Sequence, residues 1–292
     1  MSETLRETAP AHSAVPAIPQ GNPWGHWRNQ TLAVMRLELR KSFLGKRVFL
    51  LLVLALMPVF LLAMRWMLAS EIVEDPANLA DATKHFSAIY QAFTLRVIVF
   101  LGCVWIFGNL IRREVLDRSL HYYFLSPMRR EVLVVAKYLI GVVVAIVLFG
   151  TATLLSYLLA YAPHTGVGNF FFRGPGFAHL GSYLLVTALA CMGYGAVFLA
   201  LGFFFKSPAI PALAVFGWER ILFLLPPLLK KVSVSHYLQS LCPVPFDEGP
   251  LAILADAPSP WISIPGLFIM SAVLLAISAR RIKKMEISYE ED

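Results

Sequence analysis

Apolar residues occur along this chain in long uninterrupted runs that are separated by short charged segments. Runs of about eighteen or more apolar residues are typical of helices that cross a membrane. The pattern predicts six such spans, at residues 48–68, 95–111, 138–161, 180–205, 209–225 and 261–279. We therefore expect an all-α integral membrane protein with six transmembrane helices.

A basic amphipathic segment precedes the first predicted span. Between residues 23 and 47, apolar side chains recur at helical spacing, while arginine and lysine lie mostly off that stripe. Such a helix lies in the membrane interface with its apolar face down, and tryptophan suits the headgroup zone. The residues of this predicted interfacial helix are Trp24, Trp27, Leu32, Met35, Leu39 and Phe43. The alternative is an ordinary charged flank that orients the first span.

The distribution of positive charge predicts the orientation of the spans. Eighteen of the 25 lysines and arginines fall before the first span, between the second and third, at Lys206 or after the last. Because such residues stay in the cytoplasm, both termini should be cytoplasmic. The acidic segment 70–91 and the Gly- and Pro-rich loop 162–179 should be external. Residues 226–260, which hold both Lys230 and Lys231 and three acids, are ambiguous.

These features divide the chain into three parts. Residues 1–22 are polar and rich in alanine and proline, which predicts a disordered tail. Residues 23–282 form the predicted membrane domain, and residues 283–292 a cytoplasmic tail. No signal peptide is expected, so the first span should be its own insertion signal.

Composition narrows the functional classes. The chain is 58% hydrophobic and 15% charged, against about 25% charged residues in a soluble domain. Its net charge of +7 comes from residues that flank the apolar runs, which argues against a nucleic-acid partner. Three cysteines without close spacing give no metal site or disulfide framework. Phosphate-loop, zinc-protease and esterase motifs are absent, so we assign no catalytic or metal residue and expect no enzymatic activity.

A dense polar and aromatic segment lies between the second and third predicted spans. The stretch "REVLDRSLHYYFLSPMRREVLVVAK", residues 113–137, holds eight charges, three aromatic residues and one proline. Pro127 removes a backbone donor and disfavours helix at Ser126, which makes a rigid elbow. Exposed aromatic residues on such an elbow can anchor it in a pocket of another protein. The alternative is a solvated internal loop without a partner.

This segment resembles the first cytoplasmic loop of ABC transporter permeases of the second exporter class (ABC-2 type). That loop runs from an acidic residue through Ser or Thr, two large apolar residues and Pro to a basic residue. The resemblance identifies the following residues as a helix that couples to an ATPase: Glu114, Ser119, Tyr122, Tyr123, Phe124, Pro127, Arg129 and Arg130. Tyr123 and Phe124 replace the commoner leucines. The resemblance extends over the whole membrane domain and includes the interfacial helix, the six spans and residues 218–243, of which the last segment is the weaker evidence.

The resemblance implies a multi-pass permease subunit in the inner membrane of a bacterial cell, where it forms the translocation path of an ATP-driven exporter. It implies two copies of a separate ATPase subunit, which bind the ATP and magnesium, and a second permease chain, identical or homologous. It implies no cofactor in this chain, and short broken helices that dip into the outer leaflet over residues 226–260. An ion-gradient-driven secondary transporter and a non-transporting scaffold or assembly factor are the alternatives.

Charged residues inside the predicted spans mark a second candidate site. Glu219 and Arg220 lie late in the fifth span, where a charge needs a partner, a cavity or access to the interface. Adjacent helical residues point about 100° apart, so these two are poor mutual partners. We expect Arg220 to reach outward, and Glu219 to pair with Arg65 or Arg96 near the outer ends of the first two spans. A structural ion pair and a polar lining of the translocation path are both consistent with this pattern.

Overall fold

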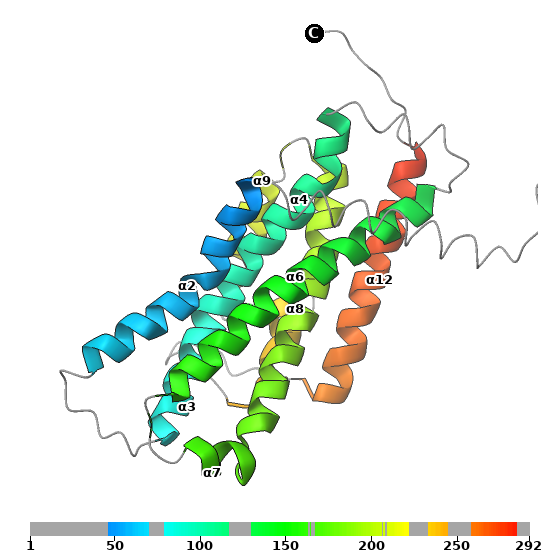
Figure 1. Cartoon of the computed structure of the whole chain (residues 1–292). Helices are drawn as coiled ribbons and strands as arrows, with labels where there is room; N and C mark the ends of the chain where they lie inside the picture. The colour runs from blue at the N-terminus through cyan, green and yellow to red at the C-terminus, as the bar shows by residue number, and fades with distance from the viewer. Residues whose placement is uncertain are drawn as a thin grey trace, which may run out of the picture.

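The computed structural model of the protein is almost entirely helical in the part of the chain that it describes. Described are residues 46–69, 79–116, 130–162, 164, 167–205, 207, 209–221, 233–244 and 258–284. Within these ranges no strand occurs, and five helical stretches are long and apolar enough to cross a membrane (Figure 1). Several such helices in one chain indicate a multi-pass membrane protein. The predicted interfacial helix lies outside the described residues.

The long helices alternate in direction. At one end of the bundle α2 (Lys46–Ala69) and α6 (Arg130–Tyr161) begin, while α4 (Phe100–Leu116) and α12 (Pro260–Lys284) end (Figure 1). We call this the basic end, because the basic segments of the sequence adjoin it. The loops that connect helices at this end are those that the charge distribution predicts to be cytoplasmic. The alternation agrees with that prediction, while the side of the membrane itself stays a prediction.

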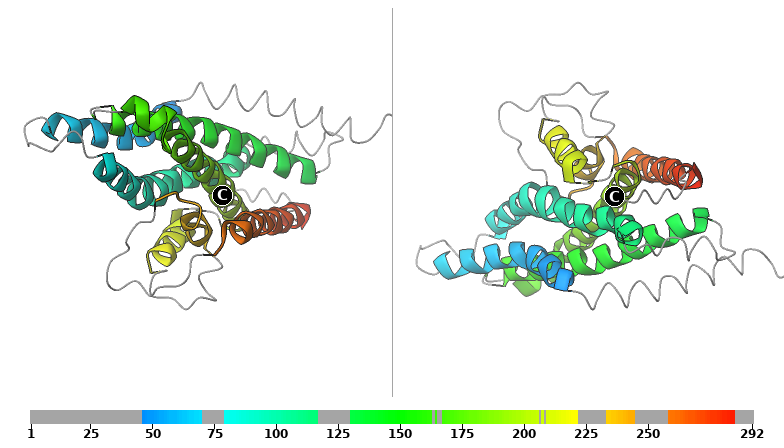
Figure 2. Two further views of the ribbon diagram at one scale, coloured as in Figure 1. Left: turned by 90° about the horizontal axis from the view of Figure 1, so that it is seen from below. Right: turned by 90° about the horizontal axis from the view of Figure 1, so that it is seen from above.

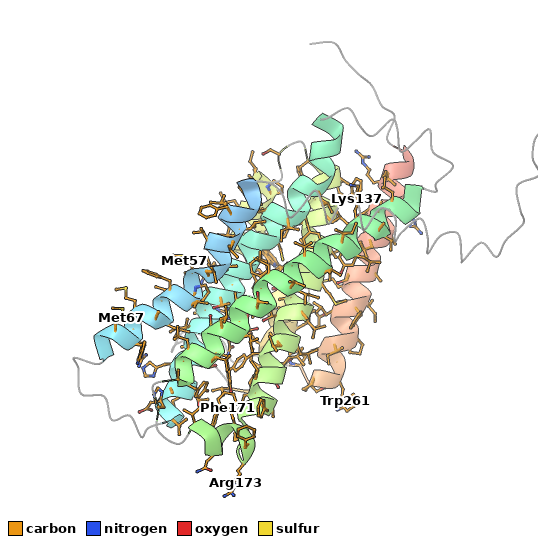
Figure 3. The ribbon with its side chains drawn as sticks, viewed as in Figure 1. Met57, Met67, Lys137, Phe171, Arg173 and Trp261 are labelled. Atoms are coloured by element: carbon orange, nitrogen blue, oxygen red, sulfur yellow. The ribbon has the colours of Figure 1, made fainter. Side chains whose placement is uncertain are left out.

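The first crossing, α2, covers the predicted span 48–68. Pro58 lies inside the helix without ending it, which a membrane helix tolerates. The helix packs against α6, and most of its apolar side chains face outward; Phe49, for example, is 71% exposed. Figure 3 shows Met57 pointing away from the bundle. In a bilayer, this outward face of α2 is available to lipid or to another membrane helix.

The second crossing begins earlier than predicted. A helical stretch runs through α3 (Leu79–Ile89), the π-helix η1 (Tyr90–Val99) and α4, and its membrane-length apolar part is Asp81–Gly108. The predicted span 95–111 was therefore wrong at its start. Residues 81–91, which we expected in the external acidic segment, belong to this helical stretch.

The early start has a physical reason in the packing of its polar residues. Gln91 is buried, and its Nε2 donates to Ser87 Oγ at 2.9 Å and to the carbonyl oxygen of Val244 at 2.7 Å. Ser87 Oγ donates to the same carbonyl at 2.9 Å. Polar groups that find partners inside the protein need no water, so a polar stretch of sequence here is compatible with a packed helix.

Two longer helices form the centre of the bundle. α6 has 32 residues and contains the predicted span 138–161. α8 (Gly176–Phe204) has 29 residues and replaces the predicted span 180–205 with a slightly earlier start. α8 is apolar on all sides, as a helix surrounded by protein requires, and it packs against α4, α6 and α12. At 1.5 Å per residue its length is about 43 Å, well beyond the ~30 Å hydrocarbon core.

One aromatic ring joins three of these helices. The side chain of Phe107, on α4, is fully buried and lies against Gly141 on α6 and Gly195 on α8. A Cβ added at Gly195 would lie 2.6 Å from Phe107 Cζ, and one at Gly141 would lie still closer to the ring. Only glycine leaves room for the ring at these two positions, so α4, α6 and α8 interlock there.

The loop predicted over residues 162–179 is partly helical. It contains the short helix α7 (Val167–Phe172), and α8 already begins at Gly176. Phe170 stacks on Tyr161 with ring centroids 4.9 Å apart, and Phe171 meets the edge of the Tyr157 ring at 5.8 Å. These contacts hold the segment against the end of the bundle that is opposite the basic end (Figure 3). Gly and Pro content indicated a loop, but Phe170 and Phe171 decide its packing.

The described part of the predicted fifth span is a short helix. α9 (Ala209–Ile221) has 13 residues and a length of about 20 Å, which is less than the ~30 Å needed to span the hydrocarbon core. Residues 222–225 of the predicted fifth span lie outside the described residues, so a sixth crossing stays a prediction. The short helix α11 (Val234–Gln239) packs on α8 and α12.

The final helix, α12, begins where the span 261–279 was predicted. It continues through Arg280 and Arg281 to Lys284, so the basic cluster forms the end of the helix instead of following it. Seen along the bundle, α9 and α12 stand on one side of α4 and α8, while α2 lies on the other (Figure 2). The helix α9 thus lies at an edge of the bundle.

Candidate intramembrane polar site

Glu219 is placed by the buried face of α9. Ala212, Phe216 and Glu219 follow one another at helical spacing, and all three face the bundle. The ring centroid of Phe216 lies 5.3 Å from that of Phe100 on α4, which fixes the rotation of α9 about its axis. Glu219 lies ten residues after the start of α9, or about 15 Å along it.

The carboxyl group of Glu219 accepts hydrogen bonds from two other segments. Tyr194 Oη, on α8, donates to Oε2 at 2.6 Å, and Ser233 Oγ donates to Oε1 at 3.1 Å. The backbone N–H of Ser235 also donates to this carboxyl group. In all three contacts the carboxyl group is the acceptor.

Tyr194 is held in position by aromatic packing. Its side chain is fully buried, its ring meets the edge of the Phe100 ring at 5.3 Å and it stacks on Phe198 at 6.2 Å. Gly195, which contacts Phe107, is the next residue along α8. The hydroxyl group that binds Glu219 therefore belongs to a tightly packed part of the bundle, and a shift of α8 would move it.

A cation on the second crossing completes the site. Arg96 is half-buried on η1 and interacts electrostatically with both Glu219 and Tyr194. A π-helix is wider than an α-helix and often marks a functional position. We name Arg96, Tyr194, Glu219, Ser233 and Ser235 the Glu219 cluster. It draws on η1, α8, α9 and the start of α11, and it joins them through polar contacts within the membrane domain.

The Glu219 cluster also connects α9 to α11. Ser233 immediately precedes α11, and the N–H group of Ser235 lies in its first turn. The first N–H groups of a helix lack partners within the helix, and a negative charge is favourable near them. Glu219 satisfies one such group from a different helix. Its carboxylate therefore fixes the position of α11 relative to α9 and α8.

Arg220 has a different environment from its neighbour. It is exposed, and its guanidinium carbon lies 5.0 Å from the centroid of the Phe216 ring, a cation–π contact. A Cβ added at Gly217, one turn before it, would contact nothing. Arg220 thus lies beside open space at the edge of the bundle, although it occupies nearly the same depth as Glu219.

A second polar network lies nearer the opposite end of the bundle. Tyr90 Oη donates to the carbonyl oxygen of Tyr183 at 3.0 Å and lies 2.8 Å from Thr187 Oγ1. Thr187 Oγ1 in turn lies 3.3 Å from Thr153 Oγ1. All four residues are fully or almost fully buried. The network joins η1, α6 and α8 and stabilises their packing.

The structure describes the predicted site residues unevenly. Glu114 and Arg130 lie near the end of α4 and at the start of α6, but their side chains are outside the described part. The remaining coupling residues, Ser119, Tyr122, Tyr123, Phe124, Pro127 and Arg129, and all six residues of the interfacial helix lie outside it. Arg65 lies on α2, and its predicted pairing with Glu219 stays a prediction.

The partners of Glu219 were missed by sequence reasoning. Tyr194 lies in an apolar run, where a tyrosine gives no signal of its own, and Ser233 and Ser235 lie in an ambiguous segment. The spacing of Ser87, Gln91 and Thr94 at i, i+4 and i+7 was a usable signal, since it places three polar residues on one helical face.

Comparison with known proteins adds no identification. No protein-family model matches this chain, and no curated protein matches it.

Proposed function

We propose that this chain is the permease subunit of an ATP-driven exporter of the ABC-2 type. The proposal is supported by the multi-pass helical bundle together with the sequence resemblance of residues 113–137. One observation carries it: the polar and aromatic segment joins α4 to α6, two helices that interlock with α8 at Phe107. A force applied to that segment would act directly on the centre of the bundle.

The proposed route of coupling has two steps beyond the segment itself. Movement of α4 or α6 displaces the Phe107 ring, which lies against Gly195 of α8. Movement of α8 at this point displaces Tyr194 and therefore its hydrogen bond to Glu219. In packed helices such contacts have few alternative arrangements. The proposed input, ATP-driven closure of two partner subunits, would thus change the Glu219 cluster.

In this proposal the catalytic work belongs to other chains. Two ATPase subunits bind ATP and magnesium. They also bind the coupling segment through Tyr123 and Phe124. A second permease chain supplies the other half of the path. This chain contributes the path, the coupling segment and the contact with the bilayer.

The test is purification of the tagged chain from membranes of its source organism, followed by measurement of vanadate-sensitive ATP hydrolysis in the purified material. We expect hydrolysis with the wild-type chain. The double variant Tyr123→Ala/Phe124→Ala should lose most of it, because truncating buried aromatic anchors typically costs ~2 kcal/mol or more each.

The matched control is Phe172→Ala. Phe172 is 82% exposed on α7, at the end of the bundle remote from the segment, so its truncation should leave hydrolysis unchanged. Absence of hydrolysis with the wild-type chain, or full activity of the double variant, would contradict the proposal.

A second candidate function is transport driven by an ion gradient. It is favoured by Glu219 and Arg96, which interact electrostatically inside the helical bundle, because ionisable residues within a membrane bundle often mark ion pathways. Uptake into vesicles that contain this chain alone, driven by a proton or sodium gradient without ATP, would identify this function.

A further inference from the structure

A pair of exposed aromatic rings lies where α7 meets the start of α8. Phe172, at the end of α7, is 82% exposed, and Phe177, in the first turn of α8, is 55% exposed. The two rings meet edge to face, with their centroids 5.7 Å apart. Large apolar side chains that gather on a surface mark contact with a membrane or with another protein. We call Phe172 and Phe177 the exposed aromatic pair.

The position of this pair along the chain favours a membrane contact. The short connection that contains α7 joins two apolar stretches, Leu133–Tyr161 and Gly176–Phe204, and each is long enough to cross a membrane. Phe177 itself belongs to the second stretch. A short connection between two consecutive crossings stays near the boundary of the bilayer. Lipid that surrounds the start of α8 would therefore continue onto Phe172.

A tryptophan on another helix supports the same interpretation. Trp261 is 89% exposed and lies in the first turn of α12, where the apolar stretch Pro260–Ile282 begins. Figure 3 shows Trp261 and Arg173 at the end of the bundle that is opposite the basic end. Tryptophan is enriched where membrane helices meet the headgroup layer. Exposed aromatic residues of α7, α8 and α12 thus lie at one end of the bundle, as expected at a bilayer boundary.

The exposed side of α7 carries an apolar strip next to a polar strip. Gly168 and Phe172, four residues apart, share one face, and a Cβ added at Gly168 would contact nothing. Asn169 and Arg173 share the adjacent face, and both are exposed. The N–H of Arg173 donates to the carbonyl oxygen of Asn169 at 2.9 Å, so helical geometry continues to Arg173. Two such strips match the boundary between acyl chains and headgroups.

We propose that α7 anchors the protein in the phospholipid headgroup layer at the end of the bundle opposite the basic end. Phe172 lies among the acyl chains, and the guanidinium of Arg173 binds a lipid phosphate. The planar guanidinium matches a phosphate with two parallel hydrogen bonds. Figure 3 shows Arg173 pointing away from the bundle, where such a phosphate has room. The anchor is remote from residues 113–137, and it does not depend on the exporter function.

A nitroxide spin label on α7 tests the proposal. A cysteine-free background is made by replacing three residues with alanine: Cys103, Cys191 and Cys242. Phe172→Cys or Asn169→Cys then carries the label, and the purified chain is placed in phosphatidylcholine nanodiscs. Electron paramagnetic resonance measures how often the label collides with oxygen, which concentrates among acyl chains, and with a water-soluble nickel chelate. We expect the ratio of oxygen to nickel collisions to be several-fold higher at position 172 than at position 169.

Variants at Arg173 test the contact with phosphate. Arg173→Glu should lower the ratio at position 172, because a carboxylate is repelled by the lipid phosphate and lifts α7 away from the acyl chains. Arg173→Lys keeps the positive charge and should retain most of the ratio. Arg280→Glu is the matched control, because it makes the same change of charge at an exposed position of α12 near the basic end. It should leave the ratio at position 172 unchanged.

Three results would overturn the proposal. Equal ratios at positions 172 and 169 would show that Phe172 projects into water. Rare collisions with both oxygen and nickel at position 172 would show that protein, such as a second copy of the chain, covers the exposed aromatic pair. An unchanged ratio in Arg173→Glu would show that Arg173 does not bind the phosphate. Both labelled positions are exposed, so their substitution should not disturb folding.

Discussion

The Glu219 side chain shows how a charge is accommodated in an apolar environment. Its carboxylate accepts from the hydroxyl groups of Tyr194 and Ser233 and from the N–H of Ser235. Each contact replaces a water molecule that the group loses on burial. Removing one donor leaves a charged acceptor partly unsatisfied, which costs more than losing a bond between neutral groups.

Tyr194→Phe tests this difference. We expect a loss of about 1.5–3 kcal/mol in the free energy of unfolding, as for a hydrogen bond to a charged group. The control is Tyr138→Phe, because Tyr138 Oη donates at 2.9 Å to the neutral carbonyl oxygen of Met192; its expected cost is about 0.5–1.5 kcal/mol. Thermal unfolding in detergent measures both. A smaller shift for Tyr194→Phe than for Tyr138→Phe would show that the carboxyl group is not charged.

At this scale, the sequence predicted the charge but not its environment. Glu219 stands out because it is an acid in an apolar run. Tyr194 and Ser233 reach it from 25 and 14 positions away, through the packing of separate helices. Local patterns carry no information about such contacts, so the partners became visible only in the structure.

At the scale of helices, the interlock of α4, α6 and α8 depends on the absence of two side chains. Phe107 occupies the space that a Cβ at Gly141 or Gly195 would need. Adding a methyl group there forces the ring or a helix to move, and such overpacking typically costs about 1–3 kcal/mol. The same positions lie on the proposed route from the coupling segment to Glu219.

Gly195→Ala should therefore destabilise the protein by about 1–3 kcal/mol. Gly181→Ala, on the same helix, is the control, because a Cβ at Gly181 would contact nothing; it should be neutral or slightly stabilising. The unfolding midpoints of the two variants are measured in detergent and compared. Adding Phe107→Leu to Gly195→Ala should recover part of the loss. Equal midpoints for Gly195→Ala and Gly181→Ala would contradict the interlock.

Helix positions were predictable where the apolar run and the helix coincide. α2, α6, α8 and α12 each lie at or around a predicted span. The prediction failed at residues 81–91, where the side chains of Ser87 and Gln91 donate hydrogen bonds to the carbonyl oxygen of Val244. It also failed at α7, where aromatic contacts override Gly and Pro. In both places, tertiary contacts supply what the local sequence lacks.

At the scale of the whole molecule, helix direction and charge give one consistent arrangement. The basic residues at the start of α2 and the end of α12 adjoin the same end of the bundle (Figure 1). The loops at the other end are poorer in lysine and arginine. The positive-inside rule therefore predicts that the basic end faces the cytoplasm.

Cysteine labelling tests this orientation. In the cysteine-free background, Asp75→Cys should react with an impermeant maleimide added to intact cells, because residue 75 belongs to the predicted external segment. Met285→Cys, just after α12, should react only after the cells are permeabilised. Labelling of position 285 in intact cells would reverse the assignment.

Because the helices differ in length, the thickness of the bilayer should change their tilt relative to one another. The membrane-length apolar part of α2 has 19 residues and that of α6 has 29, or about 28 and 43 Å. The first matches a ~30 Å hydrocarbon core without tilt, whereas the second must incline strongly or thicken the bilayer around it. A thinner bilayer would favour a larger tilt of α6 from the bilayer normal. Since α6 begins just after residues 117–129, a change in lipid chain length would displace the same segment that the proposed ATPase partner binds.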